Sequence, residues 1–217
     1  MKQLKYLSLI ISFILISCST SRITSTWKAE NVQPKKYNKI LVLGLIRESD
    51  RSIREKMEQH LLGNLKELGY NAICACEEFG PKAFEDMTEK EAISKLNNSG
   101  IDAVLTVVLL DKTKERYYVP GRVYYSPYYV YHNRFWGYYT TMYDRIYSRG
   151  YYEVNTRYFW ESNFYDMDSK QLLYSAQTQS FDPSSSEALA HEYGKLMVNN
   201  IVKNKILLPQ SPTLKAF

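Results

Sequence analysis

The sequence is poor in the residues and motifs that usually carry chemistry. It has three histidines and three cysteines among its 217 residues. It contains no Gly-x-Ser-x-Gly elbow, no phosphate-binding glycine loop and no His-Glu-x-x-His motif. His60, His132 and His191 have no partner at metal-ligand spacing, so we interpret each as a surface or boundary residue. We therefore predict no catalytic residue, no metal site and no cofactor, and we expect that the protein is not an enzyme.

The sequence also lacks internal repeats and a strong net charge. No period of 20 to 50 residues recurs, which argues against repeat architectures. The formal net charge is +5, far from the clustered charge of a dedicated nucleic-acid binder. We therefore expect no nucleic-acid partner.

The first residues have the pattern of a secretory signal. Lys2 and Lys5 precede a short apolar run, which lacks the roughly 20 residues that a membrane span needs. The run ends in Leu15-Ile16-Ser17-Cys18, which resembles a bacterial lipobox. The resemblance implies that residues 1–17 are removed and that Cys18 is lipidated as the new N-terminus. An ordinary signal peptide with an incidental cysteine is the alternative.

A lipid on Cys18 would make the membrane a partner and place the protein in the cell envelope. By analogy with other lipoproteins, Ser19 favours the outer membrane, facing the periplasm. Residues 18–38 are polar and predict a tether to the folded domain. Within the tether, the alternation of Ile23, Ser25 and Trp27 with polar neighbours allows an edge strand.

Cys74 and Cys76 are two residues apart and are expected to lie on one strand. Same-face residues on a strand are about 6.5 Å apart with parallel Cβ directions, which is unfavourable for a disulfide. We interpret them as buried thiols beneath a helix. A vicinal redox or metal pair is the alternative.

The first half of the domain predicts alternating strands and helices. Residues 40–46 form an apolar run typical of a strand covered on both faces. Apolar residues at helical spacing follow, Gly69 supplies a stop, and residues 70–76 predict a parallel strand. Thr88 to Glu91 is a capping box before a short helix, and residues 101–110 predict a central strand.

The second half predicts a hairpin and a final helix. Residues 152–180 alternate as two strands around a turn at 166–170. Ser184 to Glu187 is a capping-box pattern before the last helix. The expected fold is α/β (α+β), with a mixed sheet of about five strands, the order β-α-β-α-β-β-β-α and helices packed on the sheet. We expect a single domain over 39–208 and a tail over 209–217.

A tyrosine-rich insertion separates the central strand from the hairpin. Residues 117–152 hold thirteen of the 20 tyrosines, and neither the helical nor the strand period is sustained. We place the insertion at 117–151. Tyr, Trp and Arg give contact area with polar tips and charge, so the insertion is the candidate binding surface for a protein or glycan. A loop that packs on itself or on the hairpin, and a contact with the membrane surface, are the alternatives. Its candidate residues are Tyr124, Tyr125, Tyr128, Tyr129, Tyr131, Arg134, Trp136, Tyr138 and Tyr139.

The order of turns resembles a group of envelope lipoprotein domains. The shared outline includes Leu68-Gly69-Tyr70, the turn Gly100-Ile101-Asp102-Ala103-Val104, and the hairpin turn from Asp166 to Leu173. These segments resemble the amino-terminal domain of TolB, the curli secretion lipoprotein and lipoprotein activators of penicillin-binding proteins. Bacterial envelope lipoproteins with a Tyr-rich insertion are closer still. The resemblance implies a binding or assembly role and carries no catalytic residue.

Two functional hypotheses follow from these observations. The first is a lipid-anchored, non-enzymatic accessory or assembly factor that binds an envelope protein partner. The second is a lipoprotein module that binds peptidoglycan or another polysaccharide through the same aromatic residues.

Overall fold

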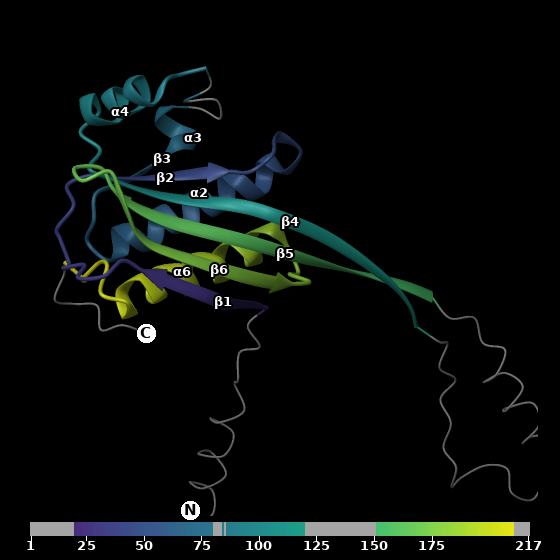
Figure 1. Cartoon of the computed structure of the whole chain (residues 1–217). Coiled ribbons are helices and arrows are strands. Elements are labelled where there is room, and N and C mark those ends of the chain that lie inside the picture. The colour runs from purple at the N-terminus through teal and green to yellow at the C-terminus, as the bar shows by residue number, and fades with distance from the viewer. Residues whose placement is uncertain (1–19, 80–83, 85, 120–150, 211–217) are drawn as a thin grey trace, which may run out of the picture. The chain divides into compact units, whose positions relative to one another are not determined.

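The computed structural model describes residues 20–79, 84, 86–119 and 151–210, and within them the chain forms one six-stranded sheet with helices (Figure 1). The strands are β1 (Ser21–Lys28), β2 (Ile40–Leu45), β3 (Ala72–Cys74), β4 (Ala103–Val119), β5 (Tyr151–Asp166) and β6 (Gln171–Phe181). The helices are a 3-10 turn η1 (Glu48–Asp50), α2 (Arg51–Glu67), α3 (Ala75–Glu78), α4 (Glu89–Asn98) and α6 (Ser186–Lys203).

The sheet is mixed, and its strand order is β1-β6-β5-β4-β2-β3. β2 is parallel to both β3 and β4, with Ile40 opposite Ala72 on one side and Ala103 on the other. β1 is antiparallel to β6 at the far edge. The predicted fold class is confirmed. The sixth strand is β1, the edge strand that the alternation at Ile23, Ser25 and Trp27 allowed.

The main core lies between one face of the sheet and helices α2 and α6, which lie side by side on it (Figure 1). Alternation along the strands selects the buried face: Ile40 and Val42 face these helices, whereas Leu41 faces the other way. The largest fully buried side chains of this core are aromatic. They are Trp160, Phe164, Tyr174 and Tyr193.

A second, smaller core lies on the opposite face, at the β2–β4 end of the sheet. Helices α3 and α4 supply Ala75 and Leu96, which pack with Leu41, Ile101 and Val104. Both faces of β2 are therefore covered, which explains why its sequence is apolar without alternation.

Two helices, α4 and α6, begin at a capping side chain, and the second cap corrects the prediction. Thr88 and Glu91 form the predicted capping box of α4. The N-cap of α6 is Ser185 rather than Ser184, because the Ser185 hydroxyl accepts a hydrogen bond from Ala188 N at 3.0 Å. With Ser185 as the N-cap, the third residue of the helix is Ala188, so Glu187 does not complete a capping box.

Two strand ends differ from the prediction. The strand expected over 70–76 ends at Cys74, because the chain turns into α3 at Ala75. The central strand was predicted over residues 101–110, but β4 continues through the charged residues that follow and ends at Val119. Charged side chains are compatible with a strand wherever its faces are exposed, as they are from Leu110 to Asp111 and from Thr113 to Arg116.

Two of the three turns quoted for the family resemblance contain an aspartate that accepts several hydrogen bonds. Asp102 accepts hydrogen bonds from Asn38 N at 2.7 Å and Lys39 N at 3.0 Å. Asp166 accepts from Ser169 N at 3.0 Å and from Lys35 Nζ at 2.9 Å. Asp166 therefore stabilises its own hairpin turn, and Asp102 holds the segment that enters β2.

The chain divides into two compact units. One comprises residues 1–111 and 158–217, and the other comprises residues 112–157. In the smaller unit, the described residues are the ends of β4 and β5.

Candidate functional site

The residues predicted to bind lipid or a partner lie outside the described part of the chain. Cys18 precedes residue 20, and the nine Tyr, Arg and Trp residues of the predicted surface fall within 120–150. Those predictions stay predictions. His132 also falls in this segment.

The smaller unit carries exposed aromatic residues beside this segment in the sequence. Tyr151 and Tyr152 are 60% and 58% exposed. The Arg116 guanidinium lies 4.1 Å from the Tyr152 ring centroid, and Arg157 pairs with Glu115 at 3.1 Å. The described ends of β4 and β5 therefore carry exposed aromatic and charged side chains.

Tertiary packing brings together two histidines that look isolated in the sequence. His60 on α2 and His191 on α6 meet edge to face, with ring centroids 5.4 Å apart. His60 Nε2 lies 2.6 Å from Glu187 Oε1, and Lys56 pairs with the same carboxylate at 3.3 Å. The hydrogen bond from His60 and then that from Lys56 hold the pKa of Glu187 below its usual value. The group joins two helices at the surface.

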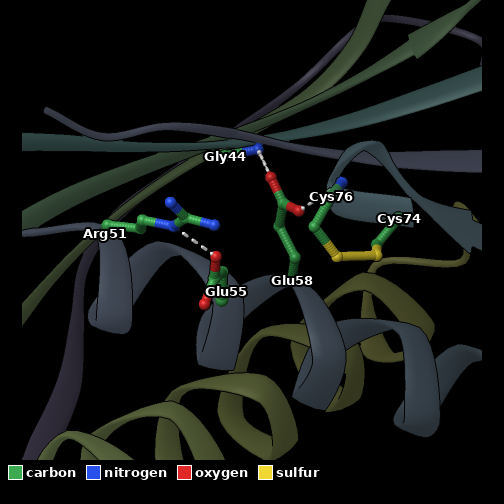
Figure 2. Close-up of a disulfide and its surroundings, with 6 residues drawn as sticks. All are labelled: Gly44, Arg51, Glu55, Glu58, Cys74 and Cys76. Carbon is green, nitrogen blue, oxygen red and sulfur yellow. Dashed lines mark hydrogen bonds and ion pairs between the residues drawn. A yellow bond between two sulfur atoms is a disulfide. The ribbon is translucent and has the colours of Figure 1, made fainter. Parts of the chain in front are cut away.

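Cys74 and Cys76 form a disulfide, which corrects the prediction of two buried thiols (Figure 2). The prediction assumed one continuous strand. Because β3 ends at Cys74 and α3 starts at Ala75, the chain turns between the two cysteines. The turn brings their Cα atoms to 5.2 Å, within the usual range for a disulfide.

Glu58 of α2 lies beside this disulfide and is buried, with 2% of its surface exposed. Its Oε1 accepts a hydrogen bond from Gly44 N at 2.7 Å, and its Oε2 accepts one from Cys76 N at 2.9 Å (Figure 2). Burial raises the pKa of Glu58 above its ordinary value of 4.5, although the two N–H groups and Arg54 oppose this shift. The carboxyl group thus bridges β2 and α3.

Two arginines from the first turns of α2 lie around the carboxyl group. The buried Arg54 pairs with Glu48 at 3.1 Å, and the exposed Arg51 pairs with Glu55 at 2.7 Å. With Cys76 and Glu58 they line a cavity of about 40 Å³, which is room enough for a water molecule. The site therefore combines a disulfide, a buried acid and guanidinium groups.

The disulfide and Glu58 are the strongest candidate for chemistry in the described residues. The two sulfurs and a Glu58 oxygen lie within 4.8 Å of one another, and no other described His, Cys, Asp or Glu residues make such a group. The sulfurs are bonded to each other, so they present no thiolate to a metal ion. Thiol–disulfide exchange is the reaction that these groups can support directly.

Sequence reasoning identified the cysteine pair but missed Glu58. The helix periodicity marks Met57, Leu61 and Leu65 as inward, and Glu58 is adjacent to that stripe. A charged residue at the border of an apolar stripe is usually solvated, so the sequence offered little reason to select it.

Comparisons with known proteins give likeness of fold. The structure is similar to a PelC dodecamer subunit from Paraburkholderia phytofirmans, at 10% identity and a TM-score of 0.43, covering 82% of this chain and 94% of that chain. It is also similar to lipoprotein GNA1162 from Neisseria meningitidis, at 16% identity and a TM-score of 0.42, covering 76% of this chain and 99% of that chain. No protein-family model and no curated protein sequence matches the chain.

None of the helices within the described residues is both long and apolar enough to cross a membrane.

Proposed function

We propose that this chain is a lipid-anchored lipoprotein of the bacterial cell envelope that acts as a non-enzymatic accessory or assembly factor for an envelope protein partner. The observation that carries the anchor is the segment Leu15-Ile16-Ser17-Cys18 behind a basic and apolar start. Lipidation at Cys18 would place the domain at the periplasmic side of the outer membrane.

The structure adds a consequence for the anchor. Thr20 already belongs to the folded unit: its N and Oγ1 donate to Glu192 Oε2 at 2.9 and 2.7 Å, and its carbonyl accepts from Phe181 N at 2.9 Å. Cys18 precedes Thr20 by two residues in the sequence, and each residue of extended chain spans at most about 3.6 Å. A lipid on Cys18 would hold the β1 edge of the domain close to the bilayer.

The partner role is supported by exposed aromatic surface on the strands that enter the Tyr-rich segment. Tyr151, Tyr152 and Val154 are each at least half exposed. Large rigid side chains with polar tips are enriched at protein interfaces. A surface of this kind suits a protein partner, and in the sequence it adjoins the tyrosine-rich residues 120–150.

The anchor is tested by Cys18→Ser. We expect the wild-type chain to enter the detergent phase and to incorporate labelled palmitate, and the variant to lose the label. A variant that still incorporates palmitate, or a wild-type chain that incorporates none, would contradict the lipid assignment.

The partner role is tested by replacing residues 120–150 with a short Gly/Ser linker. In-cell crosslinking followed by mass spectrometry should recover one dominant envelope protein with the wild-type chain and not with the linker variant. Trp27→Ala is the matched control, since Trp27 is an exposed aromatic residue elsewhere, on β1. The proposal fails if the linker variant folds and recovers the same protein.

A second candidate function is glycan binding, which the β1–β6 face favours. Trp27 is 51% exposed and opposite Ser175, and Ser25 is opposite Gln177 on the same face. Gln177 also donates to Glu161 at 3.2 Å. An aromatic ring among amide and hydroxyl groups could hold a sugar chain.

Pull-down with isolated peptidoglycan distinguishes this candidate from the first. Retention that is lost in Trp27→Ala and kept in Leu208→Ala, an exposed apolar control, would support it. Absence of retention in the wild-type chain would exclude it.

A further inference from the structure

The disulfide between Cys74 and Cys76 closes a very short loop, with one residue between its cysteines. A disulfide stabilises a fold mainly by restricting the unfolded chain, and this effect grows with the length of the closed loop. β3 and α3 already fix the backbone on either side of Ala75. A structural role therefore accounts poorly for this bond.

We propose that Cys74 and Cys76 form a thiol–disulfide exchange site for a partner protein that carries a dithiol, and that Glu58 donates and accepts the proton of the buried sulfur. The inference does not depend on the lipid anchor or on the Tyr-rich segment. A lasting disulfide also fits an oxidising compartment such as the bacterial periplasm.

The burial of the two cysteines decides which sulfur is attacked. Cys74 is fully buried at the end of β3, whereas Cys76 is partly exposed at the start of α3 and lines the cavity. An incoming thiolate can therefore reach Cys76 and not Cys74. Exchange depends on access to the attacked sulfur, so Cys76 forms the mixed disulfide and Cys74 is the leaving group.

The reaction balances with the partner dithiol as the two-electron reductant. The first partner thiolate bonds to Cys76 Sγ, the Cys74–Cys76 bond breaks, and Cys74 leaves as a thiolate that takes the Glu58 proton. The second partner thiolate then attacks the partner sulfur of the mixed disulfide. Cys76 leaves and takes a proton from solvent. The products are two thiols here and one disulfide on the partner, and Glu58 regains its proton from solvent.

Glu58 lies close enough to the buried Cys74 sulfur to protonate it when it leaves as a thiolate. A thiolate in the apolar core is costly unless it is neutralised, and a Glu58 oxygen lies within 4.8 Å of both sulfurs. Burial raises the pKa of this carboxyl group above its ordinary value, which favours its protonated form more than in an exposed glutamate. Arg54 and Glu55 are the other charged groups that act on it.

The guanidinium groups of Arg51 and Arg54 favour the thiolate form of Cys76. Arg51 and Arg54 line the same cavity as Cys76. Positive charge near a cysteine lowers the pKa of its thiol and stabilises its thiolate. The two cysteines therefore have different roles: Cys76 exchanges with the partner, and Cys74 is protonated in the core.

The first test uses the full chain in detergent and a thioredoxin-type protein whose second active-site cysteine is replaced by serine. We expect a mixed disulfide that peptide mass spectrometry maps to Cys76. Attachment at Cys74, or no adduct under conditions that keep the fold intact, would overturn the proposal. Because the readout is the peptide that contains Cys74 and Cys76, a thiol at Cys18 cannot imitate the result.

The second test is the rate of reduction by dithiothreitol as a function of pH, with Glu58→Gln and Glu55→Gln compared. Loss of a proton donor should slow reduction at neutral pH by about tenfold or more. Glu55 lines the same cavity but pairs with Arg51 in a partly exposed ion pair, so its substitution should change the rate by less than about fivefold, the upper end for such a pair. Equal rates in all three chains would remove Glu58 from the reaction.

Two further outcomes are decisive for the cysteine pair. Reduction that proceeds only as fast as global unfolding, measured by hydrogen exchange, would show a structural disulfide and overturn the proposal. Stoichiometric Zn²⁺ bound by the reduced chain, with reoxidation blocked, would replace the exchange site with a metal site. Native-state reduction and reoxidation without bound metal supports the proposal.

Discussion

Glu58 on α2 accepts a hydrogen bond at 2.7 Å from the backbone N–H of Gly44 on β2, which ties the sheet to the helix beside the disulfide. The approach is possible because residue 44 has no Cβ. A Cβ there would lie 2.8 Å from Glu58 Oε1 and 2.7 Å from Arg54 Cγ. The carboxyl group and the glycine therefore depend on each other.

Gly44→Ala should destabilise the protein. The added methyl group must displace the buried Arg54 and Glu58 side chains, and overpacking of this kind costs about 1–3 kcal/mol. Chemical denaturation followed by circular dichroism measures the change. Gly63→Ala is the matched control: no atom would lie within 4 Å of its Cβ, so this exposed helical position should gain about 0.5–1 kcal/mol. Equal effects at both positions would contradict the packing argument.

Glu58→Gln should change how stability depends on pH. Burial raises the pKa of Glu58 above 4.5, so the folded state holds this proton more tightly than the unfolded state does. The stabilisation from protonation is complete below about pH 4.3, the unfolded value, and is lost as pH rises through the raised pKa. Denaturation curves across pH 4 to 8 should show this loss in the wild-type chain and a flatter profile in Glu58→Gln. A slope that persists in the variant would assign it to other groups.

Asp166→Asn should destabilise the protein at neutral pH and less so in acid. This pH dependence is opposite to that of Glu58. Burial alone would raise the pKa of Asp166, but hydrogen bonds from Ser169 and Lys35 together hold it below its ordinary value of 3.8. Its stabilisation is therefore present above about pH 3.9, the unfolded value, and is lost as pH falls through the lowered pKa.

The expected cost of Asp166→Asn at neutral pH is about 1–3 kcal/mol, from lost charge-assisted hydrogen bonds. The difference from the wild-type chain should shrink below pH 4. Asp168→Asn is the control, because Asp168 pairs with the same Lys35 but its side chain is 70% exposed. An exposed ion pair contributes about 0–1 kcal/mol. A larger loss from Asp168→Asn than from Asp166→Asn would reverse this ranking.

Tyr193→Phe should cost about 1–2 kcal/mol. The Tyr193 hydroxyl lies 2.8 Å from Ser162 Oγ, and both residues are fully buried between α6 and the sheet. Removing the hydroxyl leaves the serine in the core without this partner. Thermal unfolding should show the loss, whereas Tyr151→Phe, at a 60% exposed position, should stay within about 0.5 kcal/mol of the wild-type chain.

The elements that the sequence predicted well are those whose apolar residues repeat with a clear period. Met57, Leu61 and Leu65 mark the buried side of α2, and the alternation from Tyr158 to Phe164 marks the core face of β5. Local hydrogen bonding gave the start of α4 through Thr88 and Glu91. Each of these signals is local, and a single chain segment suffices to produce it.

The predictions were wrong where a local sequence pattern is compatible with two different backbone structures. The alternation from Tyr70 to Cys76 suits a strand throughout, but the chain turns into α3 after Cys74 and brings the two sulfurs together. Charged residues after Leu110 suggest a loop, yet β4 continues through them.

The sequence by itself determined the order of the strands and longer helices from β2 onwards, most of the faces that are buried and the motif that ends at Cys18. Only the tertiary structure placed the Glu58 carboxyl group beside the disulfide, and paired His60 with His191. Periodicity specifies which face of an element is buried, because burial depends on the average polarity of that face. It does not specify which polar group lies opposite across the core, since that depends on how separate elements pack. Glu58, Gly44 and Cys76 meet because α2 crosses β2 and the start of α3 at one point.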